Sequence, residues 1–348
     1  MNKRRQFIKT AFLLGMAPYA LSNTHVKDRP FKSIRPKRLK KGDTVGLVAP
    51  ASSVLENESI RMAMDVIRSM GLKVKPGKHL FERKGYLAGE DANRAKDLNG
   101  MFADSSVGAI FCLRGGYGSA RMLPMIDYKN IAKNPKILLG YSDITALLNA
   151  IHLHTGLVTF HGPMPTGNYS TYSYEALKSV IMNPKPRTQL AAAPEFEPVE
   201  GQIDRDNRLV RIREGKARGK LIGGNLSLIT KLMGTPYEPD FKDAILVLED
   251  VNEKPYRIDG MLTHLWLTGK LKDMAGIAMG KWSDCDPEDP NSLTLETVFG
   301  EWCEQFKIPA VRGLMYGHVK DNATLPIGCE AELDATAGTL TLTEPSVS

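Results

Sequence analysis

Short apolar runs of strand length alternate with helical stripes through most of this 348-residue chain, and this alternation limits the folds open to it. The runs at residues 44–49, 109–113 and 137–140 are typical of buried strands. Between them, the apolar residues of 60–70 and 92–102 recur at helical spacing. Strands separated by helices of this length form βαβ units with parallel neighbouring strands. The sequence therefore predicts an α/β fold with a mostly parallel sheet.

A change in composition divides the expected fold into two domains. Four prolines and mixed charges make residues 184–215 a candidate linker. Residues 42–183 before it are expected to form an N-terminal α/β sandwich domain. Residues 216–348 after it, with a buried strand at 244–248 and a helical stripe following, are expected to form a smaller C-terminal α+β domain.

Residues 1–22 have the pattern of an export signal. A basic segment with the pair Arg4-Arg5 precedes an apolar run at 11–20 and small residues at 20–22. The paired arginines resemble the signal that the twin-arginine translocon reads. We therefore expect export of a folded protein, cleavage near Ser22, and a periplasmic or otherwise extracytoplasmic mature protein. An uncleaved membrane anchor is the alternative.

The formal net charge of +7 comes from the N-terminal part of the chain. Residues 1–22 hold four basic and no acidic residues, and residues 27–41 hold eight basic residues and one acidic residue. The segment 23–41 is therefore expected to be a basic, solvated tether. No basic face with interleaved aromatic residues is evident elsewhere, so the composition disfavours nucleic-acid binding.

Four cysteines, Cys112, Cys285, Cys303 and Cys329, are too few and too scattered for a disulfide scaffold. A single disulfide between two of them could form in an oxidising compartment. No C-x-x-C pair suggests zinc, and the glycine loop at 114–119 has neither P-loop nor dinucleotide-binding spacing. We therefore expect neither a metal nor a cofactor.

A serine stands between an expected strand and an expected helix. The apolar run 137–140 stops at Gly140, and a helical pattern begins at Ile144. Ser142 at such a corner would be held as in a nucleophile elbow, with the N–H groups of the helix behind it. Ile144 replaces the second glycine of the usual G-x-S-x-G pattern, and Ser142 could equally be a helix N-cap.

A serine hydroxyl needs a base, and the base needs a group that orients it. His318 lies in a glycine-flanked loop, where functional residues often lie. Glu249 ends the buried run 245–248, at the edge of a sheet where ligands gather in α/β folds. Asp250 beside it is the competing acid. The three candidates run in the order Ser142, Glu249, His318.

Three further histidines offer an alternative metal site. His152 and His154 are two residues apart on an expected helix, so their side chains point to different faces and form a poor metal pair. His161 ends a strand near the elbow and could line a pocket. His79 is expected in a surface turn.

The glycine loop at 114–119 suits close approach of its backbone to a bound group. We expect the N–H of Gly116 to join that of Asp143 in an oxyanion hole. Cys112, just before the loop, is expected to point inward from a strand, where thiols are usually inert.

Six segments, in order along the chain, resemble those of the L,D-carboxypeptidase family of serine peptidases. They are 42–51, 113–118, 140–145, 223–226, 248–259 and 317–318. The resemblance implies a triad on Ser142, Glu249 and His318, an active site between two domains, and a homodimer. Substrate binding is expected at Arg114, Gly115, Tyr117 and Asn225, which lie in these segments.

Two departures from the family stand out. Well-studied members are cytoplasmic, whereas this chain carries an apparent export signal, and Asp259-Gly260 stands where Asp-Arg is expected. The residues predict a metal-independent serine peptidase, and the resemblance implies that it removes the terminal D-alanine from a murein tetrapeptide. The alternatives are a self-immunity peptidase acting on peptide–nucleotide conjugates and a non-catalytic periplasmic peptide-binding protein.

Overall fold

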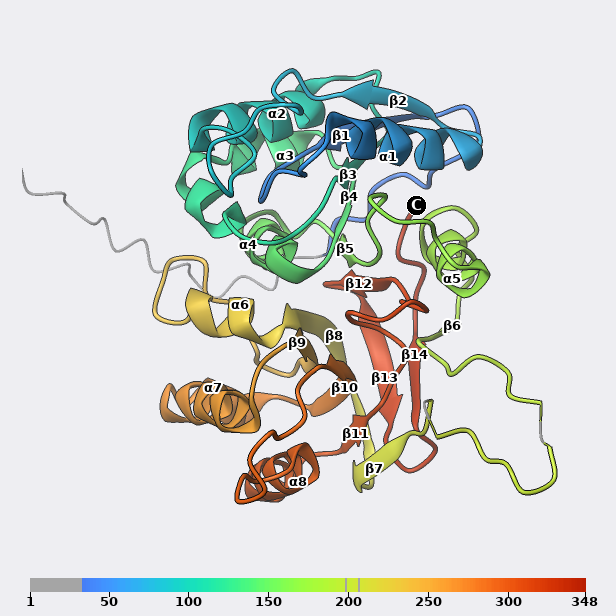
Figure 1. The fold of residues 1–348 in the computed structure, drawn as a ribbon, viewed down its shortest axis with the longest axis vertical. Coiled ribbons are helices and arrows are strands. Elements are labelled where there is room, and N and C mark those ends of the chain that lie inside the picture. Colours follow the sequence, from blue (N-terminus) through green and yellow to red (C-terminus); the bar gives the residue numbers. More distant parts are fainter. Residues whose placement is uncertain (1–32, 198, 206) are drawn as a thin grey trace, which may run out of the picture. The chain divides into compact units, whose positions relative to one another are not determined.

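Two β-sheets carry the fold (Figure 1). The computed structural model describes residues 33–348 apart from residues 198 and 206, and these belong to one unit, Ser33–Ser348. The expected export signal at 1–22 and the first part of the expected tether lie outside the described residues. In the described part, no helix is long and apolar enough to cross a membrane.

The first sheet is mostly parallel, as the sequence predicted. Its strands are β1 (Thr44–Val48), β2 (Lys73–Pro76), β3 (Ala109–Cys112), β4 (Ile137–Gly140), β5 (Thr159–His161) and β12 (Leu325–Ile327). Their order is β12-β5-β4-β3-β1-β2. Strands β1 to β5 are parallel, and β12 pairs antiparallel with β5 at the edge.

Helices cover both faces of this sheet, because its central strands are apolar on both sides. The helices are α1 (Asn57–Ser69), α2 (Asp91–Ala103), α3 (Tyr128–Lys133) and α4 (Thr145–Thr155). Phe111 of β3 packs in one apolar cluster with α1, whereas its neighbours Ile110 and Cys112 pack in another with α2, α3 and α4. The result is the expected three-layer α/β arrangement.

The second sheet is mixed. Its strands are β6 (Thr188–Leu190), β7 (Val210–Arg213), β8 (Lys216–Asn225), β9 (Ile245–Val251), β10 (Gly276–Ser283), β11 (Ala310–Arg312), β13 (Glu330–Asp334) and β14 (Thr339–Leu342). Their order is β6-β14-β13-β8-β9-β10-β11-β7. Strands β8 to β11 form a parallel core, and the strands outside it pair antiparallel.

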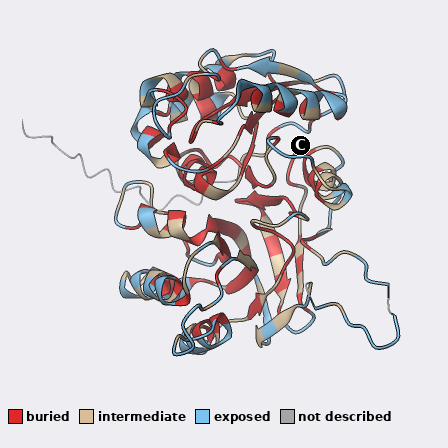
Figure 2. Cartoon of the chain, in the orientation of Figure 1, coloured by how far each residue is buried: buried red, intermediate tan, exposed pale blue. Residues whose placement is uncertain are grey.

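The remaining helices follow the apolar patterns of the second half of the chain. They are α5 (Thr171–Ile181), α6 (Leu226–Leu232), α7 (Pro255–Leu267), α8 (Leu295–Phe306) and the 3₁₀ helices η1 (Ser119–Met125), η2 (Ser142–Ile144) and η3 (Lys270–Asp273). Figure 1 shows α6, α7 and α8 along one side of the second sheet. Burial is concentrated in the strands and on the helix faces that meet them (Figure 2).

The segments between and after the expected domains contribute to both sheets. The range 184–215, expected to be a linker, contains β6 and β7, which form the two edges of the second sheet. Strand β12 lies in the range assigned to the C-terminal domain, yet it completes the edge of the first sheet. Strands of only three or four residues give too weak a pattern to be recognised without their partners.

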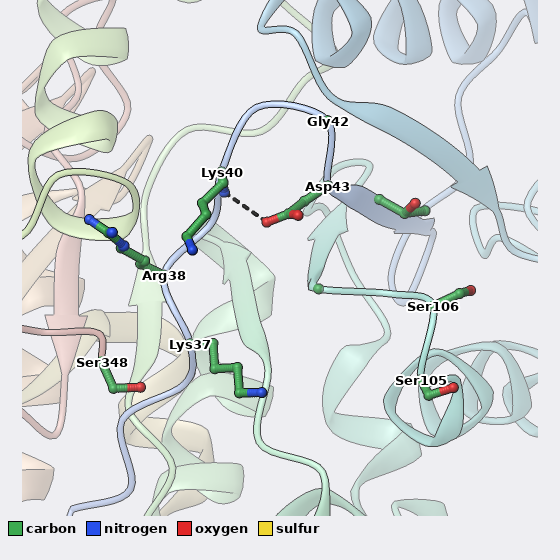
Figure 3. A pocket seen from close by; sticks show the side chains of 10 residues that line it. Lys37, Arg38, Lys40, Gly42, Asp43, Ser105, Ser106 and Ser348 are labelled. Atoms are coloured by element: carbon green, nitrogen blue, oxygen red, sulfur yellow. Dashed lines mark hydrogen bonds between the residues drawn. The ribbon is translucent and has the colours of Figure 1, made fainter.

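Residues 33–41 lie on the body of the protein, whereas the sequence predicted a solvated tether. Leu39 is buried, and its N–H donates to the carbonyl oxygen of Ile181. Ile34 forms a parallel bridge with Leu157. The basic side chains around Leu39 remain exposed and surround a hollow of about 470 Å³ (Figure 3).

The four cysteines, all within the described part of the chain, are buried and form no disulfide with one another. Burial raises the pKa of each thiol, which makes the thiolate rare. Cys112 is on β3 and is fully buried, as expected from its strand position.

Candidate active site

Ser142 lies at the sharp turn between β4 and η2. Its φ is 61°, in the left-handed region that costs a residue with a side chain roughly 1–2 kcal/mol. Its hydroxyl makes no hydrogen bond with the described residues and does not cap a helix. A strained corner that presents a free hydroxyl is the geometry of a nucleophile elbow rather than of an N-cap.

The close packing of Gly140 and Ile144 shapes this turn. A Cβ at Gly140 would lie 2.9 Å from Cγ2 of Ile144, too close for two carbon atoms. Ile144 is itself fully buried in the cluster beneath α4. The first glycine of the elbow pattern is therefore needed here, and an apolar anchor occupies the place of the second.

Glu249 and His318 form a hydrogen-bonded pair. Glu249 lies within β9, an interior strand of the second sheet, and not at a strand end as expected; it is fully buried, and its Oε2 lies 2.7 Å from Nδ1 of His318. Gly317 allows this approach, because a Cβ there would lie 3.1 Å from both Cβ and Oε2 of Glu249. The φ of Gly317 is 119°, which also favours glycine.

The charge of Glu249 suits His318 to act as a base. Burial raises the pKa of Glu249, but the imidazoles of His161 and His318 outweigh burial and lower it to about 2. Burial lowers the pKa of His318, but the bond to Glu249 and the charges of Glu249 and Asp250 outweigh burial and raise it. An ionised Glu249 can only accept, so Nδ1 of His318 carries the proton and Nε2 is left for another partner.

Ser142 and His318 line the same cavity, of about 450 Å³. Its other lining residues are Val54, Leu55, Ser59, Arg114, Gly115, Gly116, Tyr141, Met164 and Thr166. Among the described residues no carboxylate lines it, and Arg114 alone carries a fixed charge. The guanidinium donates to the carbonyl oxygen of Ser53 at 3.1 Å, which leaves further donors for a ligand.

The glycine loop approaches Ser142 closely. A Cβ at Gly115 would lie 3.1 Å from Oγ of Ser142 and 3.3 Å from the backbone nitrogen of Asp143. The N–H groups of Gly116 and Asp143 donate to no other described group. The carboxylate of Asp143 accepts from the N–H of Ser119 at 2.7 Å and so ties the loop to the elbow. Two free N–H groups beside a hydroxyl can stabilise an oxyanion.

Two of the expected substrate-binding residues are outside this cavity. Tyr117 is 47% exposed, and its ring packs edge-on against Tyr86. Asn225 is buried, donates to Asp250 at 2.8 Å and caps α6 through the N–H of Leu228. The amide of Asn225 is therefore already used within the fold. Arg114 and Gly115 are the two expected residues that line the cavity.

The other histidines do not form a metal site. Among the described residues there is no group of three potential ligands that could hold a metal ion. Nδ1 of His152 pairs with the carbonyl oxygen of Leu157, and burial lowers its pKa to about 4. His79 lies in a turn, as expected, but its side chain is mostly buried, and its Nδ1 lies 2.7 Å from Oδ1 of Asp97.

Two residues that shape the site, Arg94 and Ser52, were not predicted from the sequence. Arg94 is buried and donates to the carbonyl oxygens of Pro50 and Gly118, which holds the glycine loop in place. Ser52 accepts from the N–H of Tyr117 at 3.0 Å. The one signal in the sequence was an arginine, Arg94, within the helical stripe at 92–102. Arginine is almost never buried unless it is paired, so a buried Arg94 indicates bound partners.

The α/β fold, with a serine at a strand–helix turn and a buried glutamate–histidine pair, has the architecture of a hydrolytic enzyme. The chain belongs to the LD-carboxypeptidase family. It matches the N-terminal domain of that family over residues 45–162 and the C-terminal domain over residues 218–333. It is therefore a peptidase, as predicted from the resemblance.

Similar proteins include two murein carboxypeptidases and a self-immunity protein. A probable murein peptide carboxypeptidase of Bacillus subtilis is 41% identical over 90% of this chain and 95% of its own length. A murein tetrapeptide carboxypeptidase of Pseudomonas aeruginosa is 32% identical over 83% and 92%. The microcin C7 self-immunity protein MccF of Escherichia coli is 28% identical over 88% and 95%.

A solved structure supports the fold. The MccF-like protein of Bacillus anthracis has a TM-score of 0.79 and 31% identity, covering 90% of this chain and 100% of its own.

Proposed function

We propose that this protein is a serine-type L,D-carboxypeptidase that releases the terminal D-alanine from murein tetrapeptides. The observation that carries the proposal is one cavity lined by both Ser142 and His318, with His318 bound to the buried Glu249. The names of the relatives in Bacillus subtilis and Pseudomonas aeruginosa support the substrate class.

In the proposed reaction, Oγ of Ser142 attacks the carbonyl carbon before D-alanine, and His318 accepts the hydroxyl proton. Glu249 orients His318 and offsets its positive charge. The carbonyl oxygen becomes an oxyanion beside the N–H groups of Gly116 and Asp143. His318 then gives the proton to the leaving amine, and D-alanine departs. Water, deprotonated by the same histidine, hydrolyses the acyl-enzyme.

Arg114 is proposed to select a substrate with a free C-terminus. A carboxypeptidase must bind a carboxylate next to the scissile bond, and guanidinium groups bind carboxylates through two parallel hydrogen bonds. In the described part of the chain, Arg114 is the only fixed charge that lines the cavity, and a Cβ at its neighbour Gly115 would lie 3.1 Å from Oγ of Ser142. Both features support the proposal that the carboxylate binds close to Ser142.

Four tetrapeptides test the substrate claim. Two end in D-alanine and two in L-alanine, each with a free or an amidated C-terminus, and alanine release is followed by mass spectrometry. Release from the free D-form alone is expected. Equal cleavage of all four would make the protein a general serine peptidase and refute the substrate claim.

A second candidate is hydrolysis of peptide–nucleotide conjugates. It is favoured by the similarity to the self-immunity protein of Escherichia coli and to the MccF-like structure. An aminoacyl sulfamoyl adenosine offered beside the tetrapeptide separates the two. Faster cleavage of the nucleotide conjugate would favour the self-immunity activity.

We also propose that the protein acts outside the cytoplasm after passage through the twin-arginine translocon. Arg4→Lys combined with Arg5→Lys should leave an active precursor in the cytoplasm, whereas the wild type should be cleaved near Ser22 and exported. Unchanged export of the double variant would contradict this route. A homodimer is proposed from the family resemblance, and light scattering during size-exclusion chromatography measures the mass that tests it.

A further inference from the structure

His161 is a buried histidine that the proposed reaction does not use. It ends β5 in the first sheet, and none of its surface is exposed. Its Nε2 lies 3.7 Å from Oε1 of Glu249, on the second sheet. The opposite oxygen of that carboxylate, Oε2, binds His318. Glu249 therefore stands between two imidazoles contributed by different parts of the fold.

Nε2 of His161 and Oε1 of Glu249 have no other hydrogen-bond partner among the described residues. Within the described residues, neither ring nitrogen of His161 has a hydrogen bond, and neither does Oε1 of Glu249. A buried polar atom without a partner costs about 1–3 kcal/mol. At 3.7 Å the two atoms are too far apart for a hydrogen bond, but a shift of less than 1 Å would make one. One such bond would satisfy two of the three unpaired atoms.

The packing around His161 keeps its ring directed at Glu249. A Cβ at Gly224 would lie 2.8 Å from Cδ2 of His161, the ring carbon bonded to Nε2. The rings of Tyr141 and Tyr316 meet the imidazole edge-on, with centroids 6.0 Å and 6.1 Å away. The ring therefore has little room to turn away from the carboxylate.

We propose that His161 is a positioning residue: its Nε2–H donates to Oε1 of Glu249 and holds the other carboxylate oxygen toward His318. This inference rests on the proposed serine mechanism, in which Glu249 orients His318. With His161 in place, the carboxylate divides its accepting capacity between two donors. The carboxylate then stabilises the protonated imidazole of His318 less strongly. His318 therefore loses its proton at a pH closer to neutral.

The titratable groups that face this cluster come from three places. Asp250 is the neighbour of Glu249 on β9, Tyr316 lies in the same loop as His318, and Tyr141 precedes Ser142. Burial, and then the charge of Glu249, raise the pKa of both tyrosines, so neither ionises near neutral pH. Removal of the His161 donor should therefore act mainly on His318.

His161→Gln and His161→Met form a matched pair for the test. Their side chains have nearly the same length and volume, but only glutamine offers an N–H donor near the position of Nε2. We expect His161→Met to lower kcat about 10- to 100-fold with little change in KM, as loss of an outer partner of a reacting group does elsewhere. The acid limb of its kcat/KM profile should move to higher pH. His161→Gln should remain within about threefold of the wild type.

A measurement without substrate separates this inference from the proposed function. The imidazole of His318 is titrated by NMR in ¹⁵N-histidine-labelled protein and assigned by its absence in His318→Ala. A higher midpoint in His161→Met than in the wild type and His161→Gln supports the inference, even if no peptide is cleaved. An equal midpoint in all three proteins, or equal loss of kcat in both variants, overturns it. If His161→Met does not fold, His161→Leu takes its place.

Discussion

Gly115→Ala is expected to impair the reaction without removing any group that takes part in it. A Cβ at this position would lie 2.9 Å from Cβ of Ser142, 3.1 Å from its Oγ and 3.3 Å from the backbone nitrogen of Asp143. Gly115 is not among the residues with positive φ, so alanine fits its backbone. The effect of the substitution should therefore come from the contact alone.

The size of the effect follows from these distances. Carbon atoms pack at about 3.5–4.0 Å, so the serine and the loop must separate by roughly 0.6–1 Å. A displacement of about 1 Å from reactive geometry costs about 10²-fold in rate. Overpacking of this kind typically costs about 1–3 kcal/mol of stability, which a protein of this size can tolerate. We expect kcat to fall about 10²-fold in a folded protein.

The assay is steady-state release of D-alanine from the tetrapeptide, with circular dichroism and thermal melting on the same samples. Gly100→Ala is the matched control, because Gly100 lies within α2 and a Cβ there meets nothing within 4 Å. The control should keep wild-type kcat and gain about 1 kcal/mol of stability from better helix propensity. Wild-type kcat in a folded Gly115→Ala would refute the placement of the glycine loop against the nucleophile.

Three further predictions concern pH, metal and substrate charge. Since the pKa of His318 is raised above its ordinary value of 6.5, kcat/KM should rise with pH through a midpoint above 6.5, because only neutral His318 can accept the serine proton. The ion pair with Glu249 should also raise the free energy of unfolding. This contribution is fully present below pH 6.5 and is lost as pH rises through that same midpoint. A midpoint at or below 6.5 would contradict both the activity and the stability prediction. EDTA should leave activity unchanged, and a loss restored by zinc would revive the His152, His154 and His161 alternative. Arg114→Gln should raise KM for the free tetrapeptide at least about tenfold and so narrow the preference for a free over an amidated C-terminus, whereas an unchanged KM would argue against carboxylate binding there.

The sequence was informative where local patterns and chemistry coincide. The run that ends at Gly140 and the helix behind Ser142 follow from periodicity, and the strained turn between them follows from steric limits on the backbone. Glu249 was predicted from the end of an apolar run, and His318 from its glycine-flanked loop. The structure places Oε2 of Glu249 2.7 Å from Nδ1 of His318. Such positions can be predicted because each is marked by its immediate neighbours.

Features that depend on distant partners were not predictable. His161 meets Glu249 only because the two sheets pack together, and nothing within β5 indicates that contact. Asn225 was expected to bind substrate, yet Asp250 and α6 use its amide. Strands β6, β7 and β12 acquire their roles from the sheet edges they complete. Contacts of this kind depend on tertiary packing, which overrides local propensity.

The most direct test of the central claim compares the wild type with Ser142→Ala on one defined tetrapeptide that ends in D-alanine. Mass spectrometry follows loss of the terminal alanine, and circular dichroism confirms that both proteins are folded. We predict turnover by the wild type and a kcat lower by at least about 10³-fold in the variant. Adding His318→Ala should cause little further loss, since such groups act as a unit. Near-normal turnover by folded Ser142→Ala, or binding of the peptide by the wild type without any cleavage, would contradict it.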